Sequence, residues 1–227
     1  MVIVQPTDPR RLLSELPHKL ALRLGYHTSH PPEKTIRHAI QESVARVQER
    51  FRPRGLYQIL AVKSVDQDGI CLEQGTIKSP LLARFAGRCV GEKFIAVSIA
   101  TAGDEWREGF NSGGSSWLDL LIDALGSELA ELAADLVEDK YKADAQSRGL
   151  QVSVRMSPGY CDWGLEGQEL IFKALEAGKI GVSLTPHFIM TPAKTVSGAA
   201  VMAEKLPGDA PCAFCSKDCS HRRIRKQ

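Results

Sequence analysis

The sequence predicts an α+β fold, and three observations support this class. Segments with the period of helices and segments with the alternation of strands follow one another without a regular strand–helix–strand order. No Gly-rich phosphate loop of the type G-x-G-x-x-G is present, which disfavours a doubly wound nucleotide-binding fold. With 227 residues, 43% of them hydrophobic, the chain is long and apolar enough to bury a sizeable core.

The first half of the chain has two helix patterns and a strand-rich stretch. Residues 8–16 fit a short helix with Asp8 as its N-cap, which Pro17 would end. Residues 33–51 carry apolar side chains at helical spacing and charges between them, which predicts an amphipathic helix. The same criteria predict a hairpin of strands at 57–65 and 69–74, a short helix at 80–84 opened by Ser79, and a buried strand that ends at Gly103.

The segment 116–148 is predicted to be the longest helix. Its leucines recur near helical spacing from Leu118 to Leu136. Gly126 lies inside this pattern and costs about 1 kcal/mol relative to alanine in a helix. It therefore marks either a close packing contact or a break into two helices.

Residues 150–156 alternate apolar and polar side chains as a strand does, and the loop SPGYCDWG follows directly. A strand that ends in a tight loop is a plausible place for a binding site. Beyond it the sequence predicts a helix at 166–177 closed by Gly178, a strand at 180–184 and a last strand at 195–203.

Composition limits the classes of partner and compartment. The net charge of +2, from 29 basic and 27 acidic residues, gives no field that would favour nucleic acid. The N-terminal residues contain Pro6 and several charges before any apolar run of signal-sequence length, and no later stretch is long and apolar enough to span a bilayer. We therefore expect a cytoplasmic protein whose six cysteines are reduced, so that clustered cysteines favour metal binding over disulfides.

Three short motifs occur in a distinctive order: R-x-x-P-G-Y at 155–160, I-G-x-x-L-T at 180–185 and V-S-G at 196–198. With these motifs the chain resembles the S-adenosylmethionine-binding activation domain of cobalamin-dependent methionine synthase. The likeness is tightest over residues 155–198, and small stand-alone relatives of that domain look similar from about Leu20 onward. The resemblance implies a mostly antiparallel sheet with flanking helices.

The resemblance also implies a binding site in the loop after residue 154. Arg155 would clamp the carboxylate of S-adenosylmethionine through its guanidinium fork. Ser157, Pro158 and Gly159 would supply backbone groups, with Gly159 allowing close approach, and Tyr160 would line the site. The alternative is a strand-ending turn with a surface arginine.

Asp135 in the long helix is near the place where the family has an acidic residue beside the ligand. A carboxylate there suits the ammonium or sulfonium charge of S-adenosylmethionine. The alternative is that Asp135 is one of many solvated helix carboxylates.

A second pattern, C-x2-C-x3-C, is formed by Cys212, Cys215 and Cys219. Three thiolates at this spacing predict zinc or an iron–sulfur cluster. The fourth ligand would be Cys161, beside the predicted binding loop, or His221. The activation domain of the large enzyme lacks such a tail, so this feature departs from the family pattern.

The function that the resemblance implies is rescue of an oxidised corrinoid by reductive methylation. The chain has no corrinoid-binding D-x-H-x-x-G run, so the corrinoid and an electron donor would come from partner proteins. Two alternatives remain open: a module that senses S-adenosylmethionine or chaperones a corrinoid protein, and an iron–sulfur electron carrier. We expect an N-terminal extension at 1–30, the activation-like domain at 31–205 and a metal-binding tail at 206–227.

Overall fold

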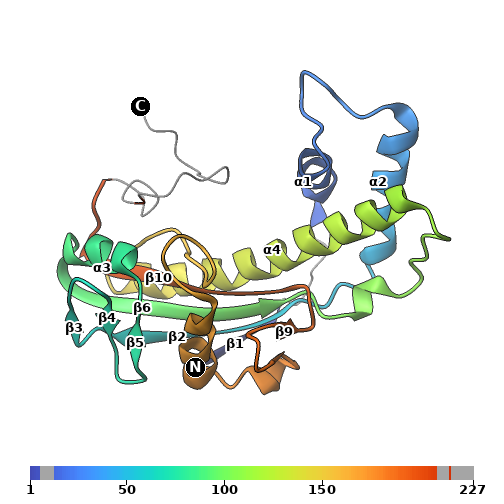
Figure 1. The fold of residues 1–227 in the computed structure, drawn as a ribbon. Coiled ribbons are helices and arrows are strands. Elements are labelled where there is room, and N and C mark those ends of the chain that lie inside the picture. The colour runs from blue at the N-terminus through green and yellow to red at the C-terminus, as the bar shows by residue number, and fades with distance from the viewer. Residues whose placement is uncertain (6–12, 209–214, 216–227) are drawn as a thin grey trace.

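A five-stranded sheet forms the centre of the computed structural model, which describes residues 1–5, 13–208 and 215. All neighbouring strands in this sheet are antiparallel, which confirms the α+β class with a mostly antiparallel sheet. Its strands, in spatial order, are β1 (Val2–Val4), β2 (Arg54–Ala61), β6 (Val90–Thr101), β10 (Thr195–Lys205) and β7 (Gln151–Val152) (Figure 1).

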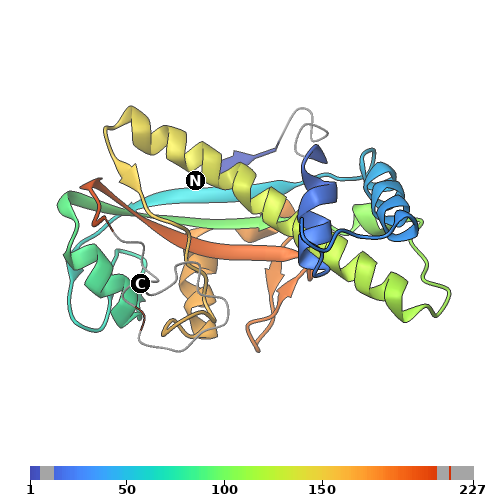
Figure 2. The same cartoon turned by 90° about the horizontal axis from the view of Figure 1, so that it is seen from above.

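One face of the sheet is covered by the long helix α4 (Ser116–Ser147). The helix lies close because small residues meet at the contact: Ala133 and Ala134 of α4 face Ala96, Ala100 and Ala200 of the strands. The helix runs along the strands, and in Figure 2 the sheet lies between it and a second layer of structure. This close packing brings α4 side chains within reach of the sheet edge.

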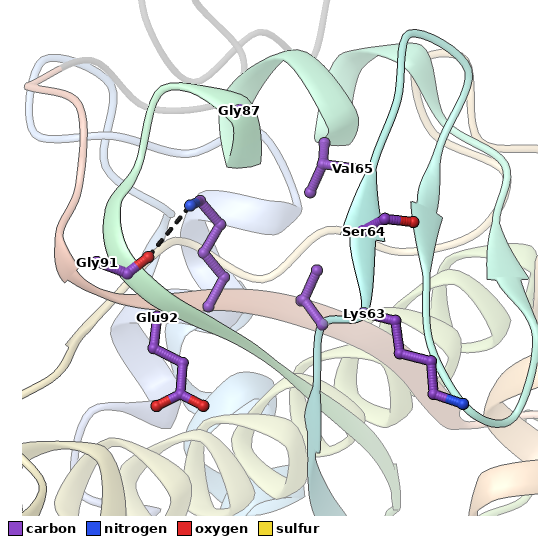
Figure 3. A pocket seen from close by; sticks show the side chains of 8 residues that line it. Lys63, Ser64, Val65, Gly87, Gly91 and Glu92 are labelled. Atoms are coloured by element: carbon purple, nitrogen blue, oxygen red, sulfur yellow. Dashed lines mark hydrogen bonds between the residues drawn. The ribbon is translucent and has the colours of Figure 1, made fainter.

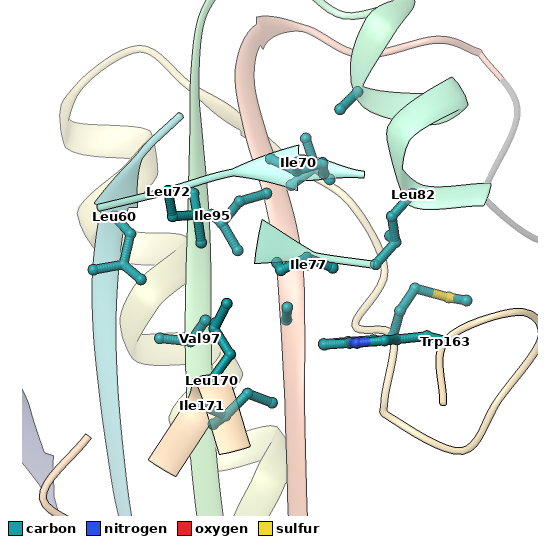
Figure 4. Packing of buried hydrophobic residues seen from close by; sticks show 14 of the residues in the cluster. Leu60, Ile70, Leu72, Ile77, Leu82, Ile95, Val97, Trp163, Leu170 and Ile171 are labelled. Carbon is teal, nitrogen blue, oxygen red and sulfur yellow. The ribbon is translucent and has the colours of Figure 1, made fainter. Parts of the chain in front are cut away.

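The opposite face carries the larger apolar core. It is covered by α3 (Pro80–Gly87), by α5 (Gln168–Ala174) and by a small sheet of β3 (Ser64–Val65), β4 (Ile70–Cys71) and β5 (Thr76–Ile77). Figure 4 shows Ile95 and Val97 of β6 among side chains of these elements. Trp163, from the loop after residue 156, fills part of the same core (Figure 4). Trp163 thereby fixes the loop to the core on the sheet face opposite α4.

Two further helices pack on the first half of α4. These are α1 (Leu16–Arg23) and α2 (Lys34–Val47), joined through buried Leu16, Leu20 and Val47 to Leu125 and Leu129 of α4. The amphipathic helix predicted over residues 33–51 is confirmed as α2. Whether residues 1–30 form a separate extension stays a prediction, although β1 and α1 both contact the rest of the fold.

The remaining described elements are short. Single 3-10 turns lie at Glu105–Arg107, Leu165–Gly167 and Ala177–Ile180, and a two-stranded sheet is formed by β8 (Ser183–Leu184) and β9 (Met190–Thr191). Among the helices of the described residues, none has both the length and the apolar character needed to cross a bilayer.

The prediction that Pro17 ends the first helix is wrong. The predicted helix at 8–16 falls largely outside the described residues, and Pro17 starts a helix instead of ending one, since it lies in the first turn of α1. Proline fits there because the first-turn N–H groups have no intrahelical partner to lose.

The strand predicted at 57–65 is also wrong in its extent. The chain leaves the large sheet after Ala61 and enters the small one at Ser64, since Val62 N donates to Lys93 O at 3.0 Å and Lys63 N donates to Cys71 O at 2.9 Å. Similarly, α5 ends at Ala174 and not near Gly178; the left-handed residue that follows is Gly181, with φ 73°.

Gly126 marks close packing, not a helix break. The helix α4 is continuous through it, and an added Cβ would lie 2.5 Å from Cζ2 of the buried Trp106. The glycine therefore lets the indole ring lie against the helix backbone.

Candidate functional site

The edge of the large sheet contains a β-bulge directly before the predicted binding loop. Val152 pairs with Met202 and Met156 pairs with Ala199, so four residue steps on one strand face three on the other. Ser153 bridges the gap: its N–H donates to Val201 O at 2.9 Å, and its Oγ accepts from Val201 N at 3.0 Å. One extra residue in a strand reverses which face the following side chains take.

The bulge sends Arg155 to the face covered by α4. Met156, the next residue, lies buried in the core on the opposite face, so Arg155 projects the other way. Its Nη2 donates to Glu131 Oε2 of α4 at 2.8 Å, and its side chain is only 10% exposed. Arg155 is sheltered from water, whereas its partner Glu131 is 39% exposed, so this charge-assisted pair is only partly removed from solvent.

Gly198 makes room for the stem of Arg155. An added Cβ at position 198 would lie 2.7 Å from Cγ and 2.9 Å from Cδ of Arg155. The methylene groups of Arg155 therefore occupy the space above the glycine of β10 that a side chain would fill. This contact explains in physical terms why the R-x-x-P-G-Y and V-S-G motifs occur together.

Glu131 belongs to a stripe of carboxylates along α4. Glu128, Glu131 and Asp135 are spaced by three and four residues, which puts them on one side of a helix. The outer two face α1: Glu128 is paired with Arg23, and Asp135 Oδ2 lies 3.5 Å from Lys19 Nζ. Arg155 and α1 thus border the same strip of α4.

Asp135, the acidic residue predicted to lie beside the ligand, faces α1 and is partly exposed. Its side chain is 52% exposed, and its ion pair is with Lys19. Glu131, one turn earlier, contacts Arg155 instead. The role of Asp135 in ligand binding stays a prediction, and Glu131 is a residue that sequence reasoning missed although its helical spacing was readable.

Tyr141 lies beneath this region, between α4 and the sheet. Burial raises the pKa of Tyr141 well above its ordinary value, the charge of Glu138 adds to the rise, and the Arg155 guanidinium lowers it in part. Its ring meets that of Tyr57 edge-on at 6.0 Å, and the Tyr57 hydroxyl donates to Asp144 Oδ2 at 2.6 Å. Tyr141 therefore lies close enough to Arg155 for the two groups to interact electrostatically.

The predicted binding loop is a compact turn. Tyr160 N donates to Ser157 O at 3.2 Å, and Gly159 N donates to Trp163 O at 2.8 Å. Gly159 has φ 91°, a conformation that favours glycine. Pro158 is buried, whereas Tyr160 is 58% exposed.

Asp162 fastens this loop to the core and was not predicted. Its Oδ1 accepts from Ser79 Oγ at 2.6 Å, and its Oδ2 accepts from Leu81 N at 2.8 Å, so it caps the N-terminus of α3 together with Ser79. The D-W pair in SPGYCDWG was the readable signal: a capping residue followed by a core anchor, Trp163.

The third motif, I-G-x-x-L-T, serves the opposite face. Ile180 and Val182 are buried in the core beneath the sheet, and Gly181 between them is left-handed. Among the described contacts, none joins this motif to Arg155. The structure therefore brings together R-x-x-P-G-Y and V-S-G, while I-G-x-x-L-T supports the fold.

Comparison with known proteins decides the family. The family model described as "Vitamin B12 dependent methionine synthase, activation domain" matches residues 89–206, more than half of the chain. The chain belongs to this family. The matched range holds α4, the bulge, the loop and β10, and thus every residue predicted to bind S-adenosylmethionine.

A solved structure shares the fold of the chain. The chain is similar to the protein in "Crystal Structure of the MetH Reactivation Domain bound to AdoHcy", with a TM-score of 0.66 and 16% identity over 92% of this chain and 80% of that chain. The resemblance stated from the motifs, and the activation-domain fold that it implied, are both confirmed.

The cysteine tail lies beyond the family match. Cys212 and Cys219 fall outside the described residues, as does His221, whereas Cys215 is described and buried, with 9% exposure. Cys161 packs against the same apolar cluster that contains Cys215. Among the described residues, no group of three or more His, Cys, Asp or Glu forms a metal site.

A shallow hollow of about 460 Å³ lies away from these activation-domain motifs (Figure 3). Its lining includes residues 62–64, where the chain passes from β2 of the large sheet to β3 of the small one. Lys93, which also lines it, donates from Nζ to Gly91 O at 3.1 Å. The hollow contains none of the predicted site residues, and we assign it no role in binding S-adenosylmethionine.

Proposed function

We propose that this activation-domain protein binds S-adenosylmethionine beside Arg155 and uses it to reactivate an oxidised corrinoid carried by a partner protein. The family assignment and the fold shared with an AdoHcy-bound domain support this proposal. The observation that carries it is the sheltered Arg155 guanidinium, which the bulge and Gly198 hold at the strand edge beside Glu131.

The pair of Arg155 and Glu131 is complementary to the amino-acid end of the ligand. That end carries a carboxylate and an ammonium, and the two protein charges have the opposite signs. On binding, the ligand carboxylate takes the place of Glu131 on the guanidinium, and Glu131 turns to the ammonium. The exchange leaves no charge unpaired, which limits the cost of desolvation.

The reaction places few demands on acid–base groups. One electron reduces cobalt(II) to cobalt(I); the cobalt(I) electron pair then attacks the sulfonium methyl carbon, the S–CH3 bond breaks, and S-adenosylhomocysteine leaves. The protein contributes mainly by holding the sulfonium in line with the metal. A corrinoid-bearing protein and an electron donor, both cytoplasmic, complete the system that we propose.

Calorimetric titration with S-adenosylmethionine tests the site. We expect Arg155→Ala to weaken binding by tenfold or more, since a hydrogen bond to a charged group contributes about 1.5–3 kcal/mol. The matched control is Arg54→Ala: Arg54 also pairs with a glutamate, Glu105, at 3.0 Å, but it lies three strand positions away, roughly 14 Å. Unchanged affinity in Arg155→Ala would refute the site.

Two carboxylate variants then locate the ammonium. Glu131→Gln keeps the size of the side chain and removes its charge, and Asp135→Asn does the same one turn along α4. Weaker binding in the first variant alone assigns the ammonium to Glu131, and weaker binding in the second supports the position suggested by the sequence.

A spectroscopic assay separates catalysis from sensing. The protein is mixed with a cobalt(II) corrinoid protein, a reductant and S-adenosylmethionine. Methylcobalt absorption that depends on Arg155 supports reactivation. Tight binding without any methylcobalt, tested across corrinoid proteins, would leave a sensor or chaperone as the function.

A further inference from the structure

Two histidines face each other in the connection between α1 and α2. His27 and His30 pair across a two-residue turn, because His27 N donates to His30 O at 3.2 Å and His30 N donates to His27 O at 2.9 Å. Residues directly opposite one another in an antiparallel pair point their side chains to the same face. The two imidazole rings therefore lie together, with their centroids 6.5 Å apart.

The backbone of this turn is restrained at both ends. Before the turn, Gly25 follows α1 in a left-handed conformation with φ 90°, as is usual after the last turn of a helix. After it, Pro31 and Pro32 fix the chain, and a proline also restricts the residue that precedes it, here His30. Both rings thus project from a backbone that is largely ordered before any ligand arrives, which lowers the entropic cost of binding.

Ser29 prepares one of the two rings for a metal ion. The Nδ1 atom of His27 lies 2.7 Å from Ser29 Oγ. A metal ion on Nε2 requires the ring proton on Nδ1, and the serine oxygen is placed to accept that proton in a hydrogen bond. Histidine ligands usually make such a bond with their second nitrogen, which fixes the tautomer and the ring orientation. This contact is independent of the distance between the rings and indicates the same ligand chemistry.

We propose that His27 and His30 together bind one zinc, copper(II) or nickel(II) ion. These ions favour imidazole nitrogen, whereas magnesium and calcium favour oxygen ligands. Zn–N bonds of about 2.0–2.1 Å at a tetrahedral angle leave two ring centroids roughly 5 Å apart. Both side chains are exposed, so rotation about their side-chain bonds can close the difference from 6.5 Å.

Two protein ligands leave coordination positions open. Over the part of the chain that the structure describes, no third His, Cys, Asp or Glu completes a metal-binding group, so water or a donor atom from another molecule fills the remaining positions. Figure 1 shows the connection between α1 and α2 standing away from the large sheet, where an ion from solution can reach it. The site is therefore a reversible one, in contrast to a closed four-ligand zinc site.

Metal binding would clamp the end of α1 to the start of α2. This matters for the rest of the fold because α1 makes ion pairs with α4, from Lys19 to Asp135 and from Arg23 to Glu128. An ion in the turn would steady the helix that carries both basic residues.

A zinc titration of the full chain, followed by NMR of 15N-labelled histidine rings, tests the site. The ring signals of His27 and His30 should move together and saturate with one midpoint. His27→Gln and His30→Gln should each weaken this binding by about tenfold or more, because a single imidazole remains. Ser29→Ala should also weaken it, because both ligands stay while the hydrogen bond that orients His27 is lost.

His38→Gln is the matched control. His38 is a surface histidine of α2 with a side chain that is 72% exposed, and its Nε2 lies 3.7 Å from Glu42 Oε1. It lies outside the proposed pair, so its replacement should leave the zinc affinity of His27 and His30 unchanged. Each ring gives its own signal, so zinc that binds to the cysteines of the tail is distinguished from zinc in the turn.

Three results would overturn the proposal. They are separate midpoints for the two rings, unchanged affinity in His30→Gln, and an equal response to magnesium, which would indicate oxygen ligands. Because the titration needs no S-adenosylmethionine, its outcome is independent of the calorimetry on Arg155.

Discussion

Gly198→Ala tests whether the glycine of β10 makes room for Arg155. The added Cβ would lie 2.7 Å from Arg155 Cγ and 2.9 Å from the Met156 carbonyl oxygen, well inside the 3.5–4.0 Å of a favourable carbon contact. Overpacking of this kind costs about 1–3 kcal/mol, and the stiffer unfolded chain offsets about 0.4–1 kcal/mol of it. We expect a net loss of at most roughly 2.6 kcal/mol in the free energy of unfolding.

The ligand affinity should fall as well. A guanidinium pushed off its position loses part of a charge-assisted hydrogen bond of about 1.5–3 kcal/mol, so the dissociation constant of S-adenosylmethionine should rise, though by less than in Arg155→Ala. Gly178→Ala is the control, because an added Cβ there has nothing within 4 Å and the backbone needs no left-handed conformation. That variant should keep wild-type affinity.

Urea unfolding of a double-mutant cycle gives the decisive measurement. Arg155→Ala removes Cγ and Cδ, so Gly198→Ala should cost less in that background than in the wild type, with a coupling of at least about 0.5 kcal/mol. The remaining cost reflects the contact with the Met156 oxygen. An equal cost of Gly198→Ala in both backgrounds would refute the reasoning.

Two further predictions concern the support of the site. Asp162→Ala removes the acceptor for Ser79 Oγ and Leu81 N, and it should lower the free energy of unfolding by about 1–2 kcal/mol in urea, the usual cost of a lost cap; Asp139→Ala, on the exposed side of α4, is the control and should change little. The raised pKa of Tyr141 keeps it protonated when the unfolded chain ionises near pH 10, so its contribution is present below that pH and is lost as pH rises above it, by about 1.4 kcal/mol per pH unit. Tyr141→Phe should therefore flatten the fall of stability between pH 10 and 11.5, and an unchanged slope would contradict the raised pKa.

The elements that the sequence predicted well are those whose packing repeats along the chain. The period of α2 reflects one apolar side packed against its neighbours, and the period of α4 reflects contacts with α1 and α2 as well as with the sheet. The nearly continuous apolar run of β10 reflects a strand that is buried on both faces. The split between β2 and β3 was not readable, because residues 57–65 contain no glycine or proline to mark the point where the chain passes from one sheet to the other. The residue at which a strand changes its pairing partner is determined by tertiary packing and not by the local sequence.

The functional loop was located by its motifs, but its contacts were not. The turn at Gly159 was predicted, but the strand predicted over 150–156 is wrong in its extent: β7 covers only Gln151–Val152, and Arg155 lies between it and the bridge at Met156. The sequence did not reveal Glu131 or Asp162, because both act on residues that are at least 24 positions away. The spacing of residues in a helix shows which carboxylates share one side of it. Which of them forms an ion pair depends on where a residue distant in sequence, here Arg155, lies in the fold.

The bulge at residues 153–155 determines which face of the sheet each of the following side chains takes. A regular strand from Val152 to Met156 would keep Met156 with Val152 on the α4 face and put Arg155 into the apolar core below, where its charge would be unpaired. One additional residue exchanges them: Met156 fills the core and Arg155 reaches Glu131. Ser153 stabilises this exchange, because its hydroxyl replaces the carbonyl that Val201 N would otherwise bind. The apolar core and the charged site are therefore specified by the same irregularity, and neither would tolerate its loss.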